Sequence, residues 1–164
     1  MLKAILILPF NVLITIPLFI LYFNGFEIIG TKNIFLLFLT PMLFISGLTL
    51  MFWTMKLFAQ VGKGSPAPWD PINKLITHGP YAYVRNPMLL GVFLFLGGEC
   101  LLFQSQPLTY YLLIFIGINL IYFPVIEEKG LHKRYGSEYL EYKRNVPRFF
   151  PRLTPYLPPQ SDKK

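Results

Sequence analysis

The chain has 164 residues, of which 54% are hydrophobic and only 14% are charged, and its formal net charge is +7. Soluble domains carry about 25% charged residues, so this composition argues against a soluble globular domain and favours a membrane protein. Most of the basic residues lie in one loop and one tail beside hydrophobic segments, which is typical of a membrane topology signal, and we expect no nucleic-acid partner.

Four hydrophobic segments predict membrane-spanning helices, because about 20 apolar residues cross a bilayer and a helix satisfies its own backbone hydrogen bonds. In chain order we expect helices over residues 4–23, 34–59, 88–104 and 108–134. Lys3 precedes the first segment as in a signal peptide, but no small-residue cleavage site follows, so we interpret this segment as a span. The predicted fold class is all-α, a single polytopic membrane domain over residues 1–164 with four transmembrane helices.

Prolines and small residues inside these segments predict how the helices bend and pack. Pro17 and Pro41 lie within the first two helices and should bend them. Small residues that permit close helix contact in lipid occur in the second and third helices: Ser46, Gly47, Gly91, Gly97 and Gly98. Glu99 is the one carboxylate within a span, and we interpret it as reaching the nearby membrane boundary, with a functional role as the alternative.

The distribution of lysine and arginine predicts the orientation of the chain. The loop between the second and third spans and the C-terminal tail hold most of these residues, whereas the other two connections hold only Lys32. The positive-inside rule then places both termini and the middle loop in the cytoplasm.

The tail should continue the fourth helix, break at Gly136 and form a short amphipathic helix over residues 138–144 that Pro147 ends. Apolar and aromatic residues follow each other at helical spacing along it: Leu131, Tyr135, Tyr139 and Tyr142. Such a stripe is more typical of a packing face than of a ligand site.

Residues 77–88, THGPYAYVRNPM, form the densest polar and aromatic cluster, and the predicted topology places them at the same membrane face as the tail. His78 and His132 are far apart and Cys100 is the only cysteine, so we expect no metal site. Hydrolysis would need a nucleophile and base that are not evident here. Methyl transfer from S-adenosylmethionine needs mainly placement of the reactants. Tyrosine faces attract a sulfonium, and a carboxylate such as Glu127 binds an ammonium group.

Two blocks, HGPYAYVRNPMLLG and EEKGLHKRYGSEYLEYKRNVPRF, together resemble the isoprenylcysteine carboxyl methyltransferase family, which is grouped with membrane phospholipid methyltransferases. The resemblance covers roughly residues 62–152 and implies an S-adenosylmethionine-dependent membrane methyltransferase that acts on a small lipophilic acceptor at the cytoplasmic face. The family motif Arg-His-Pro-x-Tyr-x-Gly falls on residues 85–91, with Asn86 and Leu89 in place of His and Tyr. The cofactor-binding residues that the resemblance implies are Asn73, Lys74, Leu75, Ile76, His78, Tyr81, Arg85, Asn86, Pro87, Met88, Leu89 and Glu127.

Tyr122 and Phe123, at the end of the fourth span, are predicted to contact the acceptor. Eukaryotic members of the family have an arginine at the position of Phe123, thought to hold a substrate carboxylate, so this chain favours a more apolar acceptor.

Two alternatives remain open. One is an NADPH-dependent membrane reductase of the sterol reductase type, in which Lys74, Lys133 and Arg134 would bind the 2′-phosphate. The other is a non-catalytic membrane subunit that binds neither nucleotide.

Overall fold

The computed structural model describes residues 9–24, 34–62 and 75–158, and every element of regular structure in these ranges is helical. The α-helices are α2 (Ile16–Asn24), α3 (Ile34–Leu57), α4 (Pro87–Phe103), α5 (Gln106–Tyr122) and α6 (Glu128–Asn145). The shorter elements are the π-helical turns η1 (Asn11–Thr15), η2 (Phe58–Gly62) and η4 (Phe123–Glu127), and the 3-10 turn η3 (Gly79–Ala82). The described part of the chain is thus all-α, as the sequence predicts.

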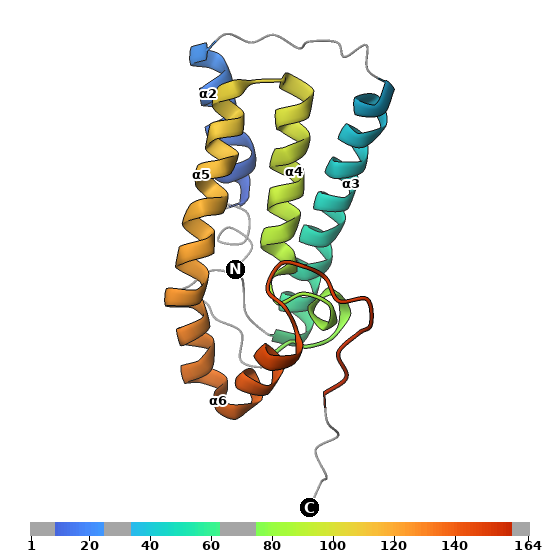
Figure 1. Ribbon diagram of the computed structural model, residues 1–164, viewed down its shortest axis with the longest axis vertical. Coiled ribbons are helices and arrows are strands. Elements are labelled where there is room, and N and C mark those ends of the chain that lie inside the picture. The colour runs from blue at the N-terminus through green and yellow to red at the C-terminus, as the bar shows by residue number, and fades with distance from the viewer. Residues whose placement is uncertain (1–8, 25–33, 63–74, 159–164) are drawn as a thin grey trace, which may run out of the picture.

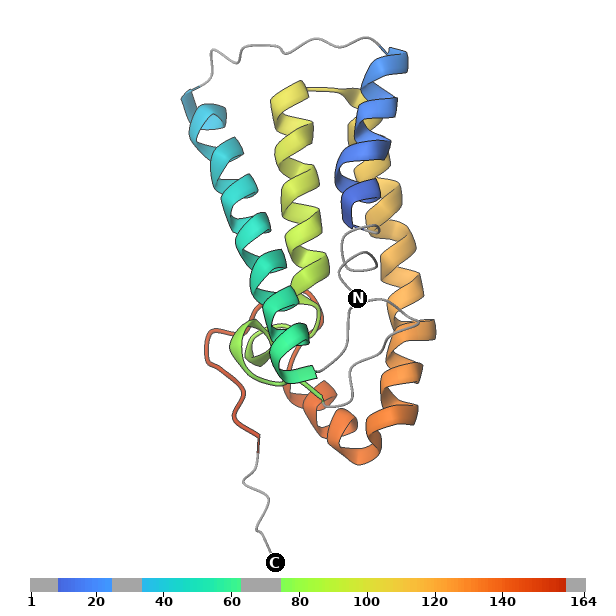
Figure 2. The same ribbon diagram turned by 180° about the vertical axis from the view of Figure 1, so that it is seen from behind.

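The α-helices form an elongated bundle with its polar segments gathered at one end. Figures 1 and 2 show α3, α4 and α5 running side by side, with α2 against the upper half of α5. The segment around η3 and the segment that follows α6 both lie at the lower end in Figure 1, beside the lower ends of α3 and α4. The candidate site is built at this end.

The last helical segment follows the predicted boundaries. α5, η4 and the first part of α6 continue from Gln106 without a gap. Gly136, at a non-helical φ of 55° and ψ of −128°, then breaks the helix, and a second helical part of α6 ends at Asn145. Glycine adopts a positive φ at little steric cost, and this break is the one that the sequence predicts. Residues 4–8 of the first predicted helix lie outside the described residues.

Two of the π-helical turns occur next to prolines, since Pro17 follows η1 and Pro124 lies within η4. Proline has no N–H, and its ring clashes with the carbonyl four residues earlier, so a wider turn accommodates it. In η4 the N–H of Glu128 donates to the carbonyl of Phe123. This wider turn contains one residue more than an α-helical turn, and it therefore changes the direction in which the following side chains point.

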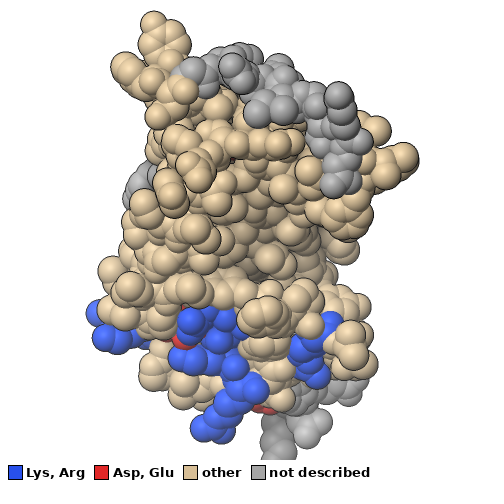
Figure 3. Space-filling model, turned by 45° about the horizontal axis from the view of Figure 1, so that its top comes forward, with Lys and Arg blue, Asp and Glu red and all other residues tan. Residues whose placement is uncertain are grey.

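The surface of the bundle is apolar around its body and charged at its polar end. Large apolar side chains point outward, with 66% of Phe35, 70% of Phe38 and 69% of Ile121 exposed. Figure 3 shows a broad uncharged surface above a group of lysine and arginine side chains. An exposed apolar area of this extent marks a surface that faces lipid.

Two helical segments, Ile34–Gln60 and Gln106–Asn145, are long and apolar enough to cross a membrane, and two shorter apolar helices, Asn11–Asn24 and Pro87–Phe103, accompany them. The 17 residues of α4 correspond to about 26 Å of helix, against a hydrocarbon core of about 30 Å. These lengths support membrane association, and the four-span topology stays a prediction.

The closest helix contact in the bundle joins α3 and α4 at two glycines. A Cβ atom on Gly47 would lie 2.7 Å from the carbonyl oxygen of Gly91, and one on Gly91 would lie 2.8 Å from the carbonyl oxygen of Gly47. A Cβ atom on Gly98 would lie 3.2 Å from the ring of Phe44. Ser46 instead donates its hydroxyl hydrogen bond to a carbonyl of its own helix. The predicted close approach therefore occurs at these glycines, where the two backbones touch.

Candidate functional site

The segment from Leu75 to Asn86, here called the loop, begins without regular secondary structure and forms the turn η3 before α4. Gly79 has a φ of 63° and packs against the end of α3, where a Cβ would lie 3.2 Å from Leu57 Cδ1. Asn86 caps α4 by accepting a hydrogen bond from the N–H of Leu89 at 3.2 Å, and Pro87 is the first helical residue. An Asn cap followed by proline is a favoured helix start, so the end of the loop is fixed.

Residues 146–158, here called the strap, follow α6 and run beside the loop. Four backbone hydrogen bonds join the two segments: Arg85 N–H to Pro147 O at 2.9 Å, Asn86 N–H to Arg148 O at 3.3 Å, Arg152 N–H to Tyr83 O at 3.0 Å and Tyr156 N–H to Ala82 O at 2.9 Å. The strap therefore satisfies loop backbone groups that no helix satisfies. Sequence reasoning did not predict this pairing.

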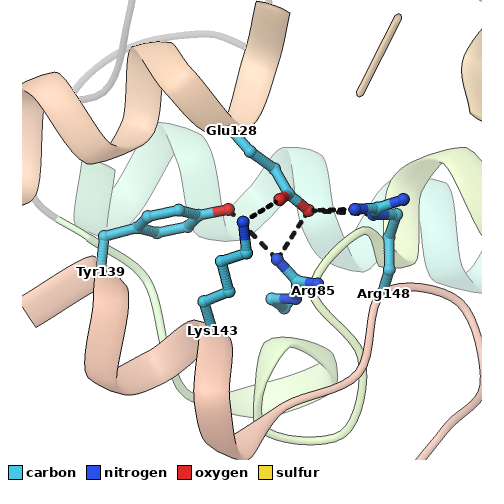
Figure 4. A network of polar contacts seen from close by, with 5 residues as sticks. All are labelled: Arg85, Glu128, Tyr139, Lys143 and Arg148. Atoms are coloured by element: carbon cyan, nitrogen blue, oxygen red, sulfur yellow. Dashed lines mark hydrogen bonds and ion pairs between the residues drawn. The ribbon is translucent and has the colours of Figure 1, made fainter. Parts of the chain in front are cut away.

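A buried carboxylate, Glu128 at the start of α6, connects the loop, α6 and the strap (Figure 4). Its side chain is 2% exposed and binds three cations. Arg85 Nη1 lies 2.6 Å and Arg148 Nη2 lies 2.9 Å from Oε1, while Lys143 Nζ lies 2.6 Å from Oε2. Arg85 Nη1 also donates to the hydroxyl of Tyr139 at 3.3 Å.

Electrostatics keeps this network charged at neutral pH. Burial by itself would raise the pKa of Glu128, but hydrogen bonds from Lys143 and Arg148 and the charges of Arg85 and Arg148 outweigh it and hold the pKa below its usual value. Burial, together with the nearby charge of Glu128, raises the pKa of Tyr139 to about 12. Glu128 is therefore ionised and Tyr139 is a neutral phenol at pH 7.

The tyrosines of α6 pack beneath the loop. Tyr139 and Tyr142 are 1% and 3% exposed, and they form a buried cluster with Leu75, Val146 and Tyr156. The hydroxyl of Tyr142 donates to the backbone oxygen of Tyr81 at 2.7 Å. The aromatic stripe of the tail is thus a packing face, as the sequence predicts, and it also holds η3 in place.

Tyr81, in the loop, and Glu127, at the end of η4, are predicted cofactor residues from different segments that interact electrostatically. Tyr81 is buried beside Phe58 and Ile76. Burial raises the pKa of its phenol, and the charges of Tyr142 and Glu127 add to the rise. Glu127 lies just past the apolar part of the last span, where burial raises the pKa of its carboxyl and the charge of Arg134 partly offsets the rise.

Among the described residues no hydrogen bond or ion pair holds the carboxylate of Glu127, in contrast to Glu128. A half-buried carboxylate is costly without a partner. Glu127 is therefore a half-buried acidic group at this end of the bundle whose burial no ion pair within the described residues offsets.

The other predicted site residues occupy several environments. Asn73 and Lys74 lie outside the described residues. The described ones are Leu75 and Ile76, which are buried; His78, which is exposed; Asn86, Pro87 and Leu89, which form the helix start; and Met88, which is half-buried. His78 is thus exposed, and the side-chain oxygen of Asn86 caps α4. Tyr81, in contrast, is buried, and Glu127 is half-buried.

Of the two predicted acceptor residues, Phe123 is buried and Tyr122 is 38% exposed. The ring of Phe123 lies 6.4 Å from that of Phe149, centroid to centroid, and the guanidinium of Arg148 lies 5.9 Å from its centroid. Tyr122 is therefore the more accessible of the two to a molecule that arrives from the lipid.

Sequence reasoning missed Glu128, Lys143 and Arg148 as a network and chose only the first of two adjacent glutamates. The π-helical turn η4 determines which of the two glutamates points at Arg85. Hydrophobic periodicity read with one constant helical period does not predict such a turn. Only the proline within this turn, Pro124, gives a local signal.

Within the described ranges no group of three or more His, Cys, Asp or Glu side chains could hold a metal ion.

Comparison with known protein families gives a match. A family model described as phospholipid methyltransferase matches residues 35–138, which is more than half of the chain and includes the loop, α4, α5 and both adjacent glutamates. No curated protein matches the sequence.

Proposed function

Because the chain belongs to the phospholipid methyltransferase family, and is on that ground a membrane methyltransferase, we propose that its methyl donor is S-adenosylmethionine. The donor binds at the polar end of the bundle, between the loop and the end of the last span. The acceptor is a small lipophilic molecule, as in the isoprenylcysteine carboxyl methyltransferases that the chain resembles. Both reactants meet at the cytoplasmic face.

The observation that supports this proposal is that the Glu127 carboxylate, which forms no ion pair among the described residues, interacts electrostatically with Tyr81 of the loop. The methionyl part of the donor has an ammonium group, which suits a half-buried carboxylate that forms no ion pair within the described ranges. The sulfonium suits the face of a neutral aromatic ring. The residues at this point therefore fit the cationic groups of the donor.

When bound, S-adenosylmethionine supplies an activated methyl group, which leaves a neutral thioether behind after transfer. The protein then has mainly to orient the reactants and exclude water, and correct placement can lower the barrier by about 7–11 kcal/mol. Arg85, fixed by Glu128, and Tyr81, fixed by the hydroxyl of Tyr142, keep the loop rigid for this purpose. No side chain is required as a nucleophile.

The acceptor reaches the site from the lipid. Tyr122 is partly exposed at the end of the last span, and its neighbours Val125 and Ile126 are 49% and 55% exposed, so this part of the helix surface is apolar. An apolar approach favours an acceptor that is dissolved in the membrane.

Calorimetric titration of the detergent-purified protein with S-adenosylhomocysteine, and with NADPH in parallel, tests the proposal. We expect S-adenosylhomocysteine to bind and NADPH not to bind. Binding of NADPH alone would favour the reductase alternative. Binding of neither, by protein that elutes as a folded single species, would favour the non-catalytic subunit.

A further inference from the structure

The strap has an unusual composition for a segment at the polar end of a membrane protein. Residues 146–158 contain phenylalanine, leucine and tyrosine together with Arg148 and Arg152, and no acidic residue. Lys143 and Arg144 directly precede the strap. Its backbone is held by the loop through the hydrogen bonds of Arg152 and Tyr156, so its side chains have defined directions.

The strap presents two different apolar faces. Val146 and Tyr156 are 1% and 9% exposed and anchor the strap in the tyrosine cluster of α6. Phe150, Leu153 and Leu157, in contrast, are 85%, 101% and 81% exposed. Three large apolar side chains that a fixed backbone points away from the protein are unfavourable in water. They are favourable where they can enter an apolar medium.

The strap lies close to the level at which a membrane would begin. Two of its carbonyl groups accept hydrogen bonds from Arg85 and Asn86, immediately before the first residue of the apolar helix α4. Figure 1 accordingly shows the strap beside the lower ends of α3 and α4. A bilayer around the apolar body would have its interface at this level.

The charges near the strap suit the same surface. Arg144 is exposed, Arg152 donates to the backbone oxygen of Asn145, and neither is paired with a carboxylate in the described part of the chain. Cations beside exposed apolar side chains are typical of segments that lie in the interface of an anionic bilayer.

We propose that the strap docks on the membrane interface. Phe150, Leu153 and Leu157 insert at the boundary between headgroups and acyl chains, and Arg144 and Arg152 bind the phosphates of anionic lipids. Because the strap is hydrogen-bonded to residues 82–86, this docking also holds the loop against the membrane surface. The proposal does not depend on which methyl donor or acceptor the protein uses.

Spin labels can measure this docking, since Cys100 is the only cysteine and a Cys100→Ser background leaves each introduced cysteine as the single labelling site. The strap variants are Phe150→Cys, Leu153→Cys and Leu157→Cys. Ile114→Cys, on the exposed apolar surface of α5, is the lipid control, and Glu141→Cys, on the exposed surface of α6, is the water control. Each protein is placed in vesicles of phosphatidylcholine alone or mixed equally with phosphatidylglycerol.

Collisions of the label with oxygen, which concentrates in lipid, are compared with collisions with a water-soluble nickel complex. We expect the oxygen-to-nickel ratio at the three strap positions to be several-fold above that of Glu141→Cys and close to that of Ile114→Cys. The ratio should rise further when phosphatidylglycerol is present. Ratios equal to that of Glu141→Cys would overturn the proposal, and so would low collision rates with both reagents, which would mean that another protein surface covers the strap.

Discussion

Two adjacent carboxylates at the polar end of the bundle have opposite surroundings. Glu128 is almost fully buried and binds three cations, which hold its pKa below the usual value. Glu127 is unpaired among the described residues, and burial raises its pKa. Neighbouring carboxyl groups whose pKa values are shifted apart have different roles. Glu128 organises the structure, and Glu127 is the residue that we propose binds the ammonium group of the donor.

The first prediction concerns Glu128. Replacing it in Glu128→Gln should lower the free energy of unfolding by about 3 kcal/mol, because the change leaves Arg85, whose side chain is 9% exposed, without its counter-charge. The matched control is Glu141→Gln, an exposed position on the same helix, which should change stability by less than about 0.5 kcal/mol. Thermal unfolding in detergent measures both variants, and equal midpoints would show that the network contributes nothing to stability.

The lowered pKa of Glu128 also predicts a pH dependence. Below the ordinary value of 4.5 the unfolded state binds the proton first, so the stabilisation from Glu128 is complete above that pH and is lost as the pH falls toward the folded pKa. The difference in unfolding midpoint between the wild type and Glu128→Gln should therefore be largest above about pH 4.5 and should shrink below it. A difference that stays constant down to the acid limit of folding would contradict this assignment.

Glu127 should matter for the ligand rather than for the fold. Glu127→Ala is expected to weaken the binding of S-adenosylhomocysteine by about 1.5–3 kcal/mol, the scale of a hydrogen bond to a charged group, while the unfolding midpoint changes little. Calorimetry measures the affinity, with Glu138→Ala, at an exposed position of α6, as the control. An unchanged affinity would show that the donor's ammonium group binds elsewhere.

At the scale of the elements, the sequence predicts what depends on local composition. Runs of apolar residues predict the helices, Gly136 predicts the bend in the tail, and the glycines of α3 and α4 predict their close contact. The π-helical turn η4 is different, because an α-helix rotates by roughly 100° per residue, so one added residue gives Glu128 about the direction that Glu127 would otherwise have. Nor does any local pattern show that the strap pairs with the loop, since that pairing depends on how distant segments fold together.

The contact of α3 with α4 yields the fourth prediction. Gly47→Ala and Gly91→Ala each place a methyl group less than 3 Å from a backbone oxygen of the facing helix, and the helices must separate to accept it. We expect each variant to lose about 1–3 kcal/mol of stability, the usual cost of overpacking. Gly117→Ala in α5 has no atom within 4 Å of the added methyl and should be neutral or slightly stabilising, since alanine favours helix. If all three variants melt alike, the glycine contact is not a determinant of the bundle.

At the scale of the whole molecule, the chain has an apolar body and one basic end (Figure 3). Such an asymmetry orients membrane proteins with the basic end toward the cytoplasm. The loop, the strap and the proposed donor site all lie at that end. The donor is a water-soluble metabolite, so a cytoplasmic site would give it direct access.

Orientation can be tested with membrane-impermeant thiol reagents on intact cells. In a Cys100→Ser background, Gln104→Cys lies in the connection between α4 and α5, and Ser137→Cys lies at the bend of α6. We expect the first to react in intact cells and the second to react only after the membrane is opened. The reverse pattern would place the proposed site on the wrong side of the membrane.

The central claim is that the loop and the end of the last span form one donor site. A structure of the protein with S-adenosylhomocysteine bound tests it most directly. We predict that the nucleoside lies against the loop, with the sulfur near Tyr81 and the ammonium group at the Glu127 carboxylate. A nucleoside bound at the opposite end of the bundle, or out of contact with both residues, would contradict the account.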